Sequence, residues 1–493
     1  MRFGVVTLGC KVNQYESQTI AAVLISRGHI RVKPGEGCDV CIINTCAVTA
    51  ESVRKSRQAV RRLKKKEPGA LIAVCGCFSQ LEPETAVKLG ADVVGGSGDR
   101  ERFTLEVERN FEIGPAKHFE NKQVKSAVMP KSASEYVVFE NIPIADLHSP
   151  ISISNLDFDN DANVSEVETG LRDVLADISS AEADPSGINN AVQSLPALMG
   201  RTRALLKIQD GCNNYCAYCV IPFARGRSRS MPLEMVSQHS RQFETAGYKE
   251  IVVTGIEISS YGKDLEGVGI TLMDAIRATS IAAPEARIRI GSLDPKMVSN
   301  ELVNGLFEIP GLCPHFHLSL QSGCDDTLRR MGRRYDTSHV LNVITDLRRV
   351  FPDCFIAADL IVGFPGENDE EFRRTMDFIN EVAFSAMHIF PFSPRPGTRA
   401  AEMPGQVNKQ QRHERAGVAA QLAEAMSLSF RQNQIAKTAD VIFEQKINGF
   451  WSGYSGNYLE IRAANGGARN MRCKMRIKSI EDNVIWGDIL SID

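Results

Sequence analysis

Residues 204–219 read ALLKIQDGCNNYCAYC, an apolar run of strand length followed at once by three cysteines. Cys212, Cys216 and Cys219 have the spacing C-x₃-C-x₂-C and lie within one tight loop. Thiolates are the usual ligands of iron–sulfur clusters, so three of them can hold three irons of a 4Fe–4S cluster and leave the fourth iron open. A zinc knuckle is the alternative, but zinc needs a fourth Cys or His at comparable spacing, and none follows nearby. The loop therefore predicts an iron–sulfur site directly after a strand.

The alternation of strands and helices that begins here continues to about residue 402. Strand-like runs cover residues 204–209, 250–255, 287–291, 316–320, 354–363 and 386–391. Six βα units predict an open or partial barrel of the TIM type, with ligands at the carboxyl ends of the strands. Residues 406–437 look helical, and the glycines and short alternating runs of residues 438–493 predict a small antiparallel β-barrel.

Residues 1–117 show a similar alternation, with apolar runs at 3–8, 40–44 and 70–75 and a basic helix at 49–66. This pattern predicts a parallel α/β domain. A cysteine follows each run: Cys10, then Cys46, then Cys75 and Cys77. Because the carboxyl ends of parallel strands share one edge of a sheet, we expect three thiols from distant segments to meet there.

The chain has 493 residues and 13 cysteines, and its ordinary hydrophobic fraction of 43% predicts a globular protein of about three domains. It contains no run of about 18 apolar residues and no visible export signal, so we expect a soluble cytosolic protein without disulfides or a membrane partner. We divide it into residues 1–117, an acidic linker or insert at 118–200, a core with a trailing helix at 201–437, and the tail at 438–493.

The net charge of the chain is −3, but residues 135–200 alone carry −11, which leaves +8 for the rest of the chain. A nucleic-acid partner is therefore compatible with the charge distribution.

The remaining cysteines have simpler interpretations. Cys38 and Cys41 have the C-x₂-C spacing of a zinc half-site, but Cys41 lies within an apolar strand and no second pair exists. We expect four scattered cysteines to be small buried apolar residues: Cys313, Cys324, Cys354 and Cys473.

The cysteine loop, with Tyr218 just before its last cysteine, resembles the radical SAM superfamily, in which the open iron binds S-adenosylmethionine (SAM). Three further segments resemble the ligands of the auxiliary cluster in methylthiotransferases: LGCKVNQYES with Cys10, NTCAVTAES with Cys46 and CGCFSQ, where the Gly-Cys pattern falls on Cys77. The whole chain except about 118–200 resembles that family, which implies an N-terminal methylthiotransferase domain, a radical SAM core and a TRAM domain in the tail.

The resemblance also implies a SAM site at the carboxyl ends of three core strands. The implied cofactor-binding residues are Gly255, Glu257, Ser319, Gln321, Asp359, Gly363, Phe364, Pro365 and Gly366. A glycine at a strand end lets the backbone approach a ligand closely. No residue is expected to act as a catalytic acid or base, because the clusters carry the chemistry.

As the family works, one SAM methylates a sulfur held at the auxiliary cluster, and a second SAM is cleaved to a radical that leads to methylthio insertion. The implied cofactors are two 4Fe–4S clusters and SAM, with a reductant such as flavodoxin or ferredoxin; the sulfur donor stays open. Lys11-Val12-Asn13 after Cys10 resembles the MtaB type, which converts N6-threonylcarbamoyladenosine at tRNA position 37 to its 2-methylthio derivative. The alternatives are isopentenyladenosine in tRNA, an aspartate of a ribosomal protein, and a non-catalytic iron–sulfur protein that binds RNA.

Basic residues mark candidate RNA contacts. In the tail, four cations alternate with apolar residues, which on a strand places the cations on one face: Arg472, Lys474, Arg476 and Lys478. Arg225 and Arg227 follow the cysteine loop, and together with Arg395 they are candidates to bind the threonyl carboxylate. The basic helix at 49–66 is a third candidate for the RNA backbone.

Overall fold

The computed structural model describes residues 1–113, 202–265, 269–463 and 465–492. The described residues form two compact units: residues 1–113 together with 223–225, and the remainder. The acidic segment predicted at 118–200 lies outside the described residues, and the four-part division of the chain stays a prediction. Within the described residues, no helix is both long and apolar enough to span a membrane.

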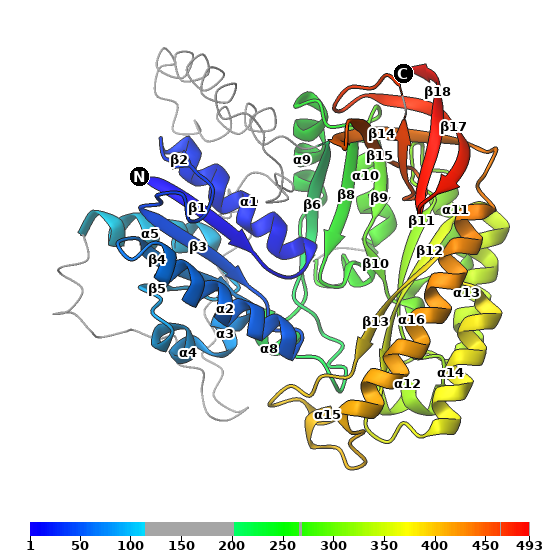
Figure 1. The fold of residues 1–493 in the computed structure, drawn as a ribbon, viewed down its shortest axis with the longest axis horizontal. Coiled ribbons are helices and arrows are strands. Elements are labelled where there is room, and N and C mark those ends of the chain that lie inside the picture. Colours follow the sequence, from blue (N-terminus) through cyan, green and yellow to red (C-terminus); the bar gives the residue numbers. More distant parts are fainter. Residues whose placement is uncertain (114–201, 266–268, 464, 493) are drawn as a thin grey trace. The chain divides into compact units, whose positions relative to one another are not determined.

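The first unit is built on a parallel five-stranded sheet with the order β2-β1-β3-β4-β5 (Figure 1). Its elements are β1 (Arg2–Thr7), α1 (Lys11–Ser26), β2 (Ile30–Arg31), β3 (Val40–Thr45), α2 (Ala50–Lys66), β4 (Leu71–Gly76), α3 (Cys77–Leu81), α4 (Pro83–Lys88), β5 (Val93–Val94) and α5 (Arg100–Ile113). The three predicted strands and the parallel α/β class are confirmed. The edge strands β2 and β5 are two residues long, too short to leave a pattern in the sequence.

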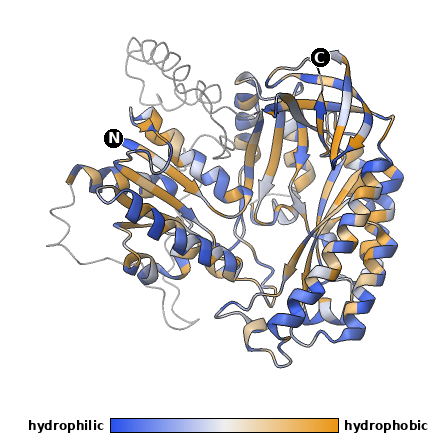
Figure 2. Ribbon diagram, viewed as in Figure 1, coloured by the Kyte–Doolittle hydropathy of each residue, from blue (hydrophilic) through white to orange (hydrophobic). Residues whose placement is uncertain are grey.

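Helix α2 confirms the predicted basic helix and shows why it forms. Thr49 caps its start, because the Thr49 side chain accepts from the backbone N–H of Ser52 at 3.0 Å. The buried face carries Val53, Val60 and Leu63 at helical spacing. Figure 2 shows hydrophobic residues concentrated in the strands and hydrophilic ones along α2.

The second unit contains the core and the tail. Its core elements are β6 (Arg203–Asp210), α8 (Ile221–Arg225, whose last three residues group with the first unit), β7 (Arg229–Ser230), α9 (Leu233–Thr245), β8 (Glu250–Gly255), η3 (Ile258–Ser260), α10 (Leu272–Ala282), β9 (Arg287–Ile290), β10 (Ser292–Leu293), η4 (Pro295–Met297), α11 (Asn300–Phe307), β11 (His315–Gln321), α12 (Asp325–Met331), α13 (Thr337–Val350), β12 (Phe355–Val362), α14 (Asp369–Val382), β13 (Ala386–Pro391), α15 (Arg399–Glu402) and α16 (Lys409–Gln432). The tail elements are β14 (Thr438–Ile447), β15 (Phe450–Ser455), β16 (Glu460–Ala463), β17 (Arg472–Glu481) and β18 (Val484–Ile492).

All six predicted core strands are present, as β6, β8, β9, β11, β12 and β13. They form two four-stranded sheets, with the orders β7-β6-β8-β9 and β10-β11-β12-β13. Every pairing is parallel except the one between β6 and the short strand β7. The break falls between β9 and β10, on either side of Gly291, so the hydrogen bonds do not run through one continuous sheet.

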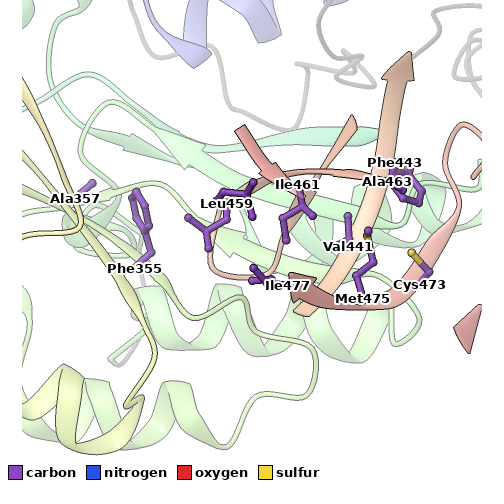
Figure 3. Close-up of a cluster of buried hydrophobic side chains, with 11 residues drawn as sticks. Phe355, Ala357, Val441, Phe443, Leu459, Ile461, Ala463, Cys473, Met475 and Ile477 are labelled. Atoms are coloured by element: carbon purple, nitrogen blue, oxygen red, sulfur yellow. The ribbon is translucent and has the colours of Figure 1, made fainter. Parts of the chain in front are cut away.

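The tail forms a closed five-stranded barrel with the order β14-β15-β16-β18-β17. The predicted antiparallel barrel is confirmed in four of its pairings, whereas β16 and β18 pair in parallel. Figure 3 shows the barrel core, where Val441, Ile461 and Met475 pack in a cluster that extends to Phe355 of β12. The barrel and the core therefore share one hydrophobic interior.

A buried ion network joins the core to the barrel. Glu250 on β8 accepts from Arg287 Nε at 2.5 Å and from Arg289 Nε at 2.7 Å. Arg287 donates onward to the carbonyl oxygens of Asp440 and Tyr454, each at 2.7 Å. Arg289 donates to the carbonyl oxygens of Gly456 and Ser455. Burial alone would raise the pKa of Glu250, but Arg289 and Arg287 outweigh it and lower the pKa, so this carboxylate is ionised.

Replacing Glu250 with Gln should destabilise the second unit strongly. The substitution leaves two buried guanidinium groups without their counter-ion, and breaking a buried pair costs about 3–5 kcal/mol. Thermal unfolding and limited proteolysis of the tail measure the loss. The control is Glu370→Gln on α14, which removes an exposed pair with Arg373 and should cost less than about 1 kcal/mol. Equal effects of the two substitutions would contradict the role of the network.

Candidate functional site

The first three cysteines lie at the carboxyl edge of the first sheet. Register pairs such as Thr7 with Asn44 and Thr45 with Gly76 bring the ends of β1, β3 and β4 level. Gly9 has φ +105°, and a Cβ added to it would lie 3.0 Å from the Sγ of Cys46. The loop that carries Cys10 therefore touches Cys46, and the turn requires a glycine.

The thiols of this group are close enough to influence one another. Burial raises the pKa of Cys77 to about 12, and the charges of Cys10 and Cys46 add to the increase. Desolvation is also the main cause of the raised pKa of Cys10, with a contribution from Cys46, although Cys10 is an exposed residue. Cys75 lies within β4 and is fully buried. The choice of Cys77 over Cys75 as a ligand stays a prediction.

A buried group of charges lies behind these thiols. Glu16 on α1 accepts from Arg225 Nη1 at 2.7 Å and from Arg100 Nη2 at 2.6 Å. Arg225 Nη2 also donates to Asn13 Oδ1 at 2.7 Å. The positive charge of Arg225 opposes the desolvation that raises the pKa of Cys10 and Cys77, so it favours their thiolate forms. The site thus suits an anionic cluster.

These contacts change the interpretation of two sequence motifs. Arg225 was a candidate RNA contact, but its side chain is buried in the ion pair with Glu16, so we replace that assignment with an electrostatic role beside the thiols. In Lys11-Val12-Asn13, Val12 is buried and Asn13 donates to the carbonyl oxygens of Leu8 and Thr45. Asn13 therefore holds the loop before Cys10.

In the second unit, the cysteine loop follows β6 as predicted and is fixed at its start and in its middle. Gly211 has φ +71°, and a Cβ there would lie 1.9 Å from the carbonyl oxygen of Arg227, so only glycine fits. The N–H of Ala217 donates to the carbonyl oxygen of Met331 at 2.8 Å, and its carbonyl oxygen accepts from Ala400 at 2.8 Å. Backbone bonds thus hold the middle of the loop between α12 and α15.

The three thiols of this loop form a second coupled group. Burial raises the pKa of Cys219 to about 12, with contributions from Cys216 and Cys212, and burial raises the pKa of Cys212 to about 11. The backbone N–H of Asn214 lies 3.5 Å from Cys212 Sγ and favours its thiolate. Three thiols with N–H donors fit a cluster that keeps one iron open for SAM.

Arg333 is a residue that the sequence interpretation missed. Its Nη1 lies 3.3 Å from Cys216 Sγ, and its Nη2 donates to the carbonyl oxygen of Ser319 at 3.1 Å. Asp294 pairs with the same guanidinium at 3.1 Å, and the pKa of Arg333 is raised by neighbouring negative groups despite its burial. Arg333 thus connects the cysteine loop to the end of β11. An arginine far from the loop in sequence carries no signal that would identify it.

The turn after β12 is built around the same loop. Phe364 is fully buried in a cluster with Ala217, and its ring meets that of Tyr218 edge-to-face at 6.5 Å. The N–H of Gly363 donates to Glu367 Oε1 at 2.8 Å, and Arg415 holds the same oxygen at 2.8 Å. Phe364 therefore packs the turn against the cysteine loop, and its assignment to SAM stays a prediction.

The other predicted SAM residues lie where the strands end. Gly255 ends β8, where a Cβ would lie 2.8 Å from the carbonyl oxygen of Gln209. Glu257 accepts from the N–H of Ser259 at 3.1 Å. Gln321 has φ +69° at an irregularity in β11, a left-handed conformation that is uncommon outside glycine.

The carbonyl oxygen of Pro365 accepts a hydrogen bond from Arg330, and the N–H of Gly366 donates to the carbonyl oxygen of Gly405, so both residues lie in the same turn as Phe364. Asp359 lies apart from these, between two histidines.

Strand β17 has the predicted alternation. Cys473, Met475 and Ile477 are buried in the barrel, whereas Lys474, Arg476 and Lys478 are exposed. Arg472 pairs with Asp440 and Lys478 with Asp488, each at 3.0 Å. Among the described residues, Lys474 and Arg476 have no ion pair, which makes them the strongest candidates for phosphate contact.

The remaining predicted residues are more dispersed. Arg227 is exposed and Arg395 is buried. Cys38 and Cys41 are both buried, and the raised pKa of Cys41 has desolvation as its main cause and Cys38 as the next. The four scattered cysteines are buried, as predicted.

Two family models match the chain: the Radical SAM superfamily at residues 206–379, and Uncharacterized protein family UPF0004 at residues 2–96. The structure is similar to the radical SAM methyltransferase TsrM of Kitasatospora setae, solved with cobalamin and a [4Fe-4S] cluster bound. The TM-score is 0.50 and the identity 14%, covering 81% of this chain and 77% of that one. This likeness supports the fold alone. The radical SAM core implies SAM and one 4Fe–4S cluster, which Cys212, Cys216 and Cys219 fit.

Replacing Arg333 with Leu should make the cluster of this loop harder to reduce. The guanidinium contact to Cys216 Sγ stabilises added negative charge, and a charge-assisted hydrogen bond of about 1.5 kcal/mol corresponds to about 60 mV for one electron. A redox titration followed by electron paramagnetic resonance should give a more negative midpoint potential. The matched control is Arg334→Leu, an exposed neighbour that should leave the potential unchanged. An unchanged potential in Arg333→Leu would contradict the role of Arg333.

Three relatives cover nearly the whole chain. The threonylcarbamoyladenosine tRNA methylthiotransferase MtaB of Thermotoga maritima is 33% identical, covering 97% of this chain and 95% of the relative. MtaB of Bacillus subtilis is 31% identical over 92% and 88%. The tRNA-2-methylthio-N(6)-dimethylallyladenosine synthase of Caldicellulosiruptor saccharolyticus is 30% identical over 98% and 91%. With both groups of cysteines at strand ends, and the second group inside a radical SAM core, the chain belongs to the radical SAM methylthiotransferase family.

Proposed function

We propose that this enzyme converts N6-threonylcarbamoyladenosine at position 37 of tRNA to its 2-methylthio derivative. The observation that carries the proposal is the relative of Thermotoga maritima, whose name states this substrate and which matches over 97% of the chain. Lys11-Val12-Asn13 after Cys10 supports the same subfamily. Isopentenyladenosine in tRNA is the second candidate, because the relative of Caldicellulosiruptor saccharolyticus acts on that type of base according to its name.

The chemistry divides between cofactors and side chains. When bound, SAM and the iron–sulfur clusters supply the radical and the sulfur transfer that an aromatic C–H bond requires. The side chains hold and tune those groups: Arg333 at the second cysteine group, and Arg225 with Glu16 at the first. Flavodoxin or ferredoxin is the proposed reductant. The tail barrel is proposed to bind the tRNA backbone.

A second 4Fe–4S cluster at Cys10, Cys46 and Cys77 forms part of the proposal. Anaerobic reconstitution should give about eight irons per chain, since each group of three thiols holds one cluster. Replacing Cys212, Cys216 and Cys219 with Ala should leave about four irons, and replacing the first group should do the same. The matched control is Cys313→Ala, because Cys313 is buried away from both groups. A wild-type content near four irons would reject the second cluster.

The substrate test uses purified, reconstituted enzyme and two tRNAs that differ only at position 37. One carries threonylcarbamoyladenosine and the other isopentenyladenosine, and mass spectrometry of the nucleosides detects the methylthio product. We expect product from the first tRNA at least about tenfold faster, because a pocket built for a polar substituent rejects an apolar one. Preferred conversion of the isopentenyl tRNA would reject the substrate assignment and leave the family assignment intact.

Lys474 and Arg476 should bind phosphates and should not read bases. The double substitution Lys474→Gln/Arg476→Gln should weaken tRNA binding and reduce the salt slope by about 1.5, as expected for two lost phosphate contacts. Titrations at several salt concentrations measure both quantities. The matched control, Lys88→Gln/Lys409→Gln, removes two exposed charges elsewhere and should change neither. An unchanged affinity and slope in the first variant would exclude β17 from the RNA contact.

A further inference from the structure

Four strands of the second core sheet carry a row of polar side chains. Ser292 Oγ on β10 lies 2.5 Å from His317 Nδ1 on β11. His317 Nε2 lies 3.2 Å from Asp359 Oδ1 on β12, and His388 Nδ1 on β13 lies 3.2 Å from the same oxygen. We call His317, Asp359 and His388 the His–Asp–His group. Within the part of the chain that the structure describes, the hydrogen bonds and ion pairs of this group involve neither the cysteines nor the residues that hold them.

The His–Asp–His group lies on the less buried face of the second core sheet. Side chains alternate along a strand, so His317 shares a face with Ser319, one repeat of about 7 Å further along β11. On the opposite face, Phe316 and Leu318 are fully buried. The group therefore lies on the side that carries the predicted SAM residue Ser319, one layer from it.

The group keeps hydrogen-bonding capacity for a ligand. Burial would raise the pKa of Asp359, but its contacts with His317 and His388 outweigh this and lower the pKa to about 2, so the carboxylate is ionised. His317 Nε2 is buried and lies 3.2 Å from Asp359 Oδ1, so it pairs with the carboxylate. The side chain of His388 is 60% exposed. The exposed imidazole of His388 is therefore the part of the group that a ligand can reach.

We propose that the His–Asp–His group binds the polar substituent on N6 of the substrate adenine, with His388 as the principal contact. This inference rests on the proposed function. A threonylcarbamoyl group offers a carbonyl, N–H groups, a hydroxyl and a carboxylate, whereas an isopentenyl chain offers no hydrogen bond. An apolar chain placed here would offer no hydrogen bond to the exposed imidazole of His388, and sites built for polar groups discriminate strongly against a ligand that lacks them.

The experiment compares kcat/KM of the reconstituted full-length enzyme on the two tRNAs introduced above. Their ratio within one preparation cancels any loss of folded or loaded enzyme. His388→Phe should lower the preference for the threonylcarbamoyl tRNA at least about tenfold, mainly through a higher KM for that tRNA, because the phenyl ring keeps the bulk and loses the hydrogen bonds. His388→Gln keeps a donor and an acceptor and should recover part of the preference. The matched control is His413→Phe on α16, an exposed histidine whose replacement should leave the ratio unchanged.

The outcomes separate this inference from the function on which it rests. If the wild-type enzyme makes no methylthio product from the threonylcarbamoyl tRNA, both are rejected. If the wild-type enzyme makes it and His388→Phe keeps the same ratio, only the His–Asp–His assignment is rejected. The three ligand atoms lie within 4.8 Å of one another, so a divalent metal is a competing occupant. An equal loss on both tRNAs, together with loss of one tightly bound zinc in His388→Phe, would overturn the proposal in favour of a metal site.

Discussion

Parallel strands end at one edge of their sheet, and this constraint brings together cysteines that are far apart in the sequence. In the first unit it brings Cys10, Cys46 and Cys77 to the ends of β1, β3 and β4. In the second unit it places the cysteine loop at the end of β6, beside the turns that follow β11 and β12. The chain must turn sharply from strand to loop each time, and glycines with positive φ at Gly9, Gly76 and Gly211 make these turns possible.

Both groups of thiols are compensated by a buried guanidinium. Arg225 favours the thiolates of the first group and Arg333 those of the second, although desolvation raises the pKa of Cys77 and Cys219 to about 12. The thiols of Cys77 and Cys219 are therefore protonated near neutral pH before a cluster binds. Cluster assembly must release those protons, so the loaded state becomes more favourable as the pH rises. The positive charges of Arg225 and Arg333 then balance part of the negative charge of the bound clusters.

The sequence predicts most of this architecture because its signals are local. Apolar runs such as 250–255 and 386–391 are strands in the structure, and the alternation around Met475 places cations outside the barrel. The spacing of Cys212, Cys216 and Cys219 indicates their chemistry directly.

Other features could not be predicted from the sequence. Strands of two residues, such as β2 and β10, are too short to produce a pattern. Arg333, and the histidines that meet at Asp359, become partners only through the fold, since neither their spacing nor their neighbours mark them. Arg225 shows the converse: a cation near the loop suggests RNA, yet a glutamate 209 positions away in the sequence pairs with it.

The joint between the core and the tail barrel has a consequence for how such enzymes diversify. The hydrogen bonds that Arg287 and Arg289 donate to the barrel end on main-chain carbonyl oxygens, at Asp440, Tyr454, Ser455 and Gly456. Two side chains add to them: Asp440 pairs with Arg287 at 3.7 Å, and the centroid of the Tyr458 ring lies 4.8 Å from Arg289 Cζ. A carbonyl oxygen is present whatever the side chain, so these hydrogen bonds recognise the path of the backbone, and the contacts of these two arginines depend on the barrel side chains Asp440 and Tyr458. The outer surface of the barrel is thus free to change its sequence without loosening its attachment. A graft of another barrel with the same backbone, in which Asp440 and Tyr458 are kept, should therefore dock onto this core in the same orientation.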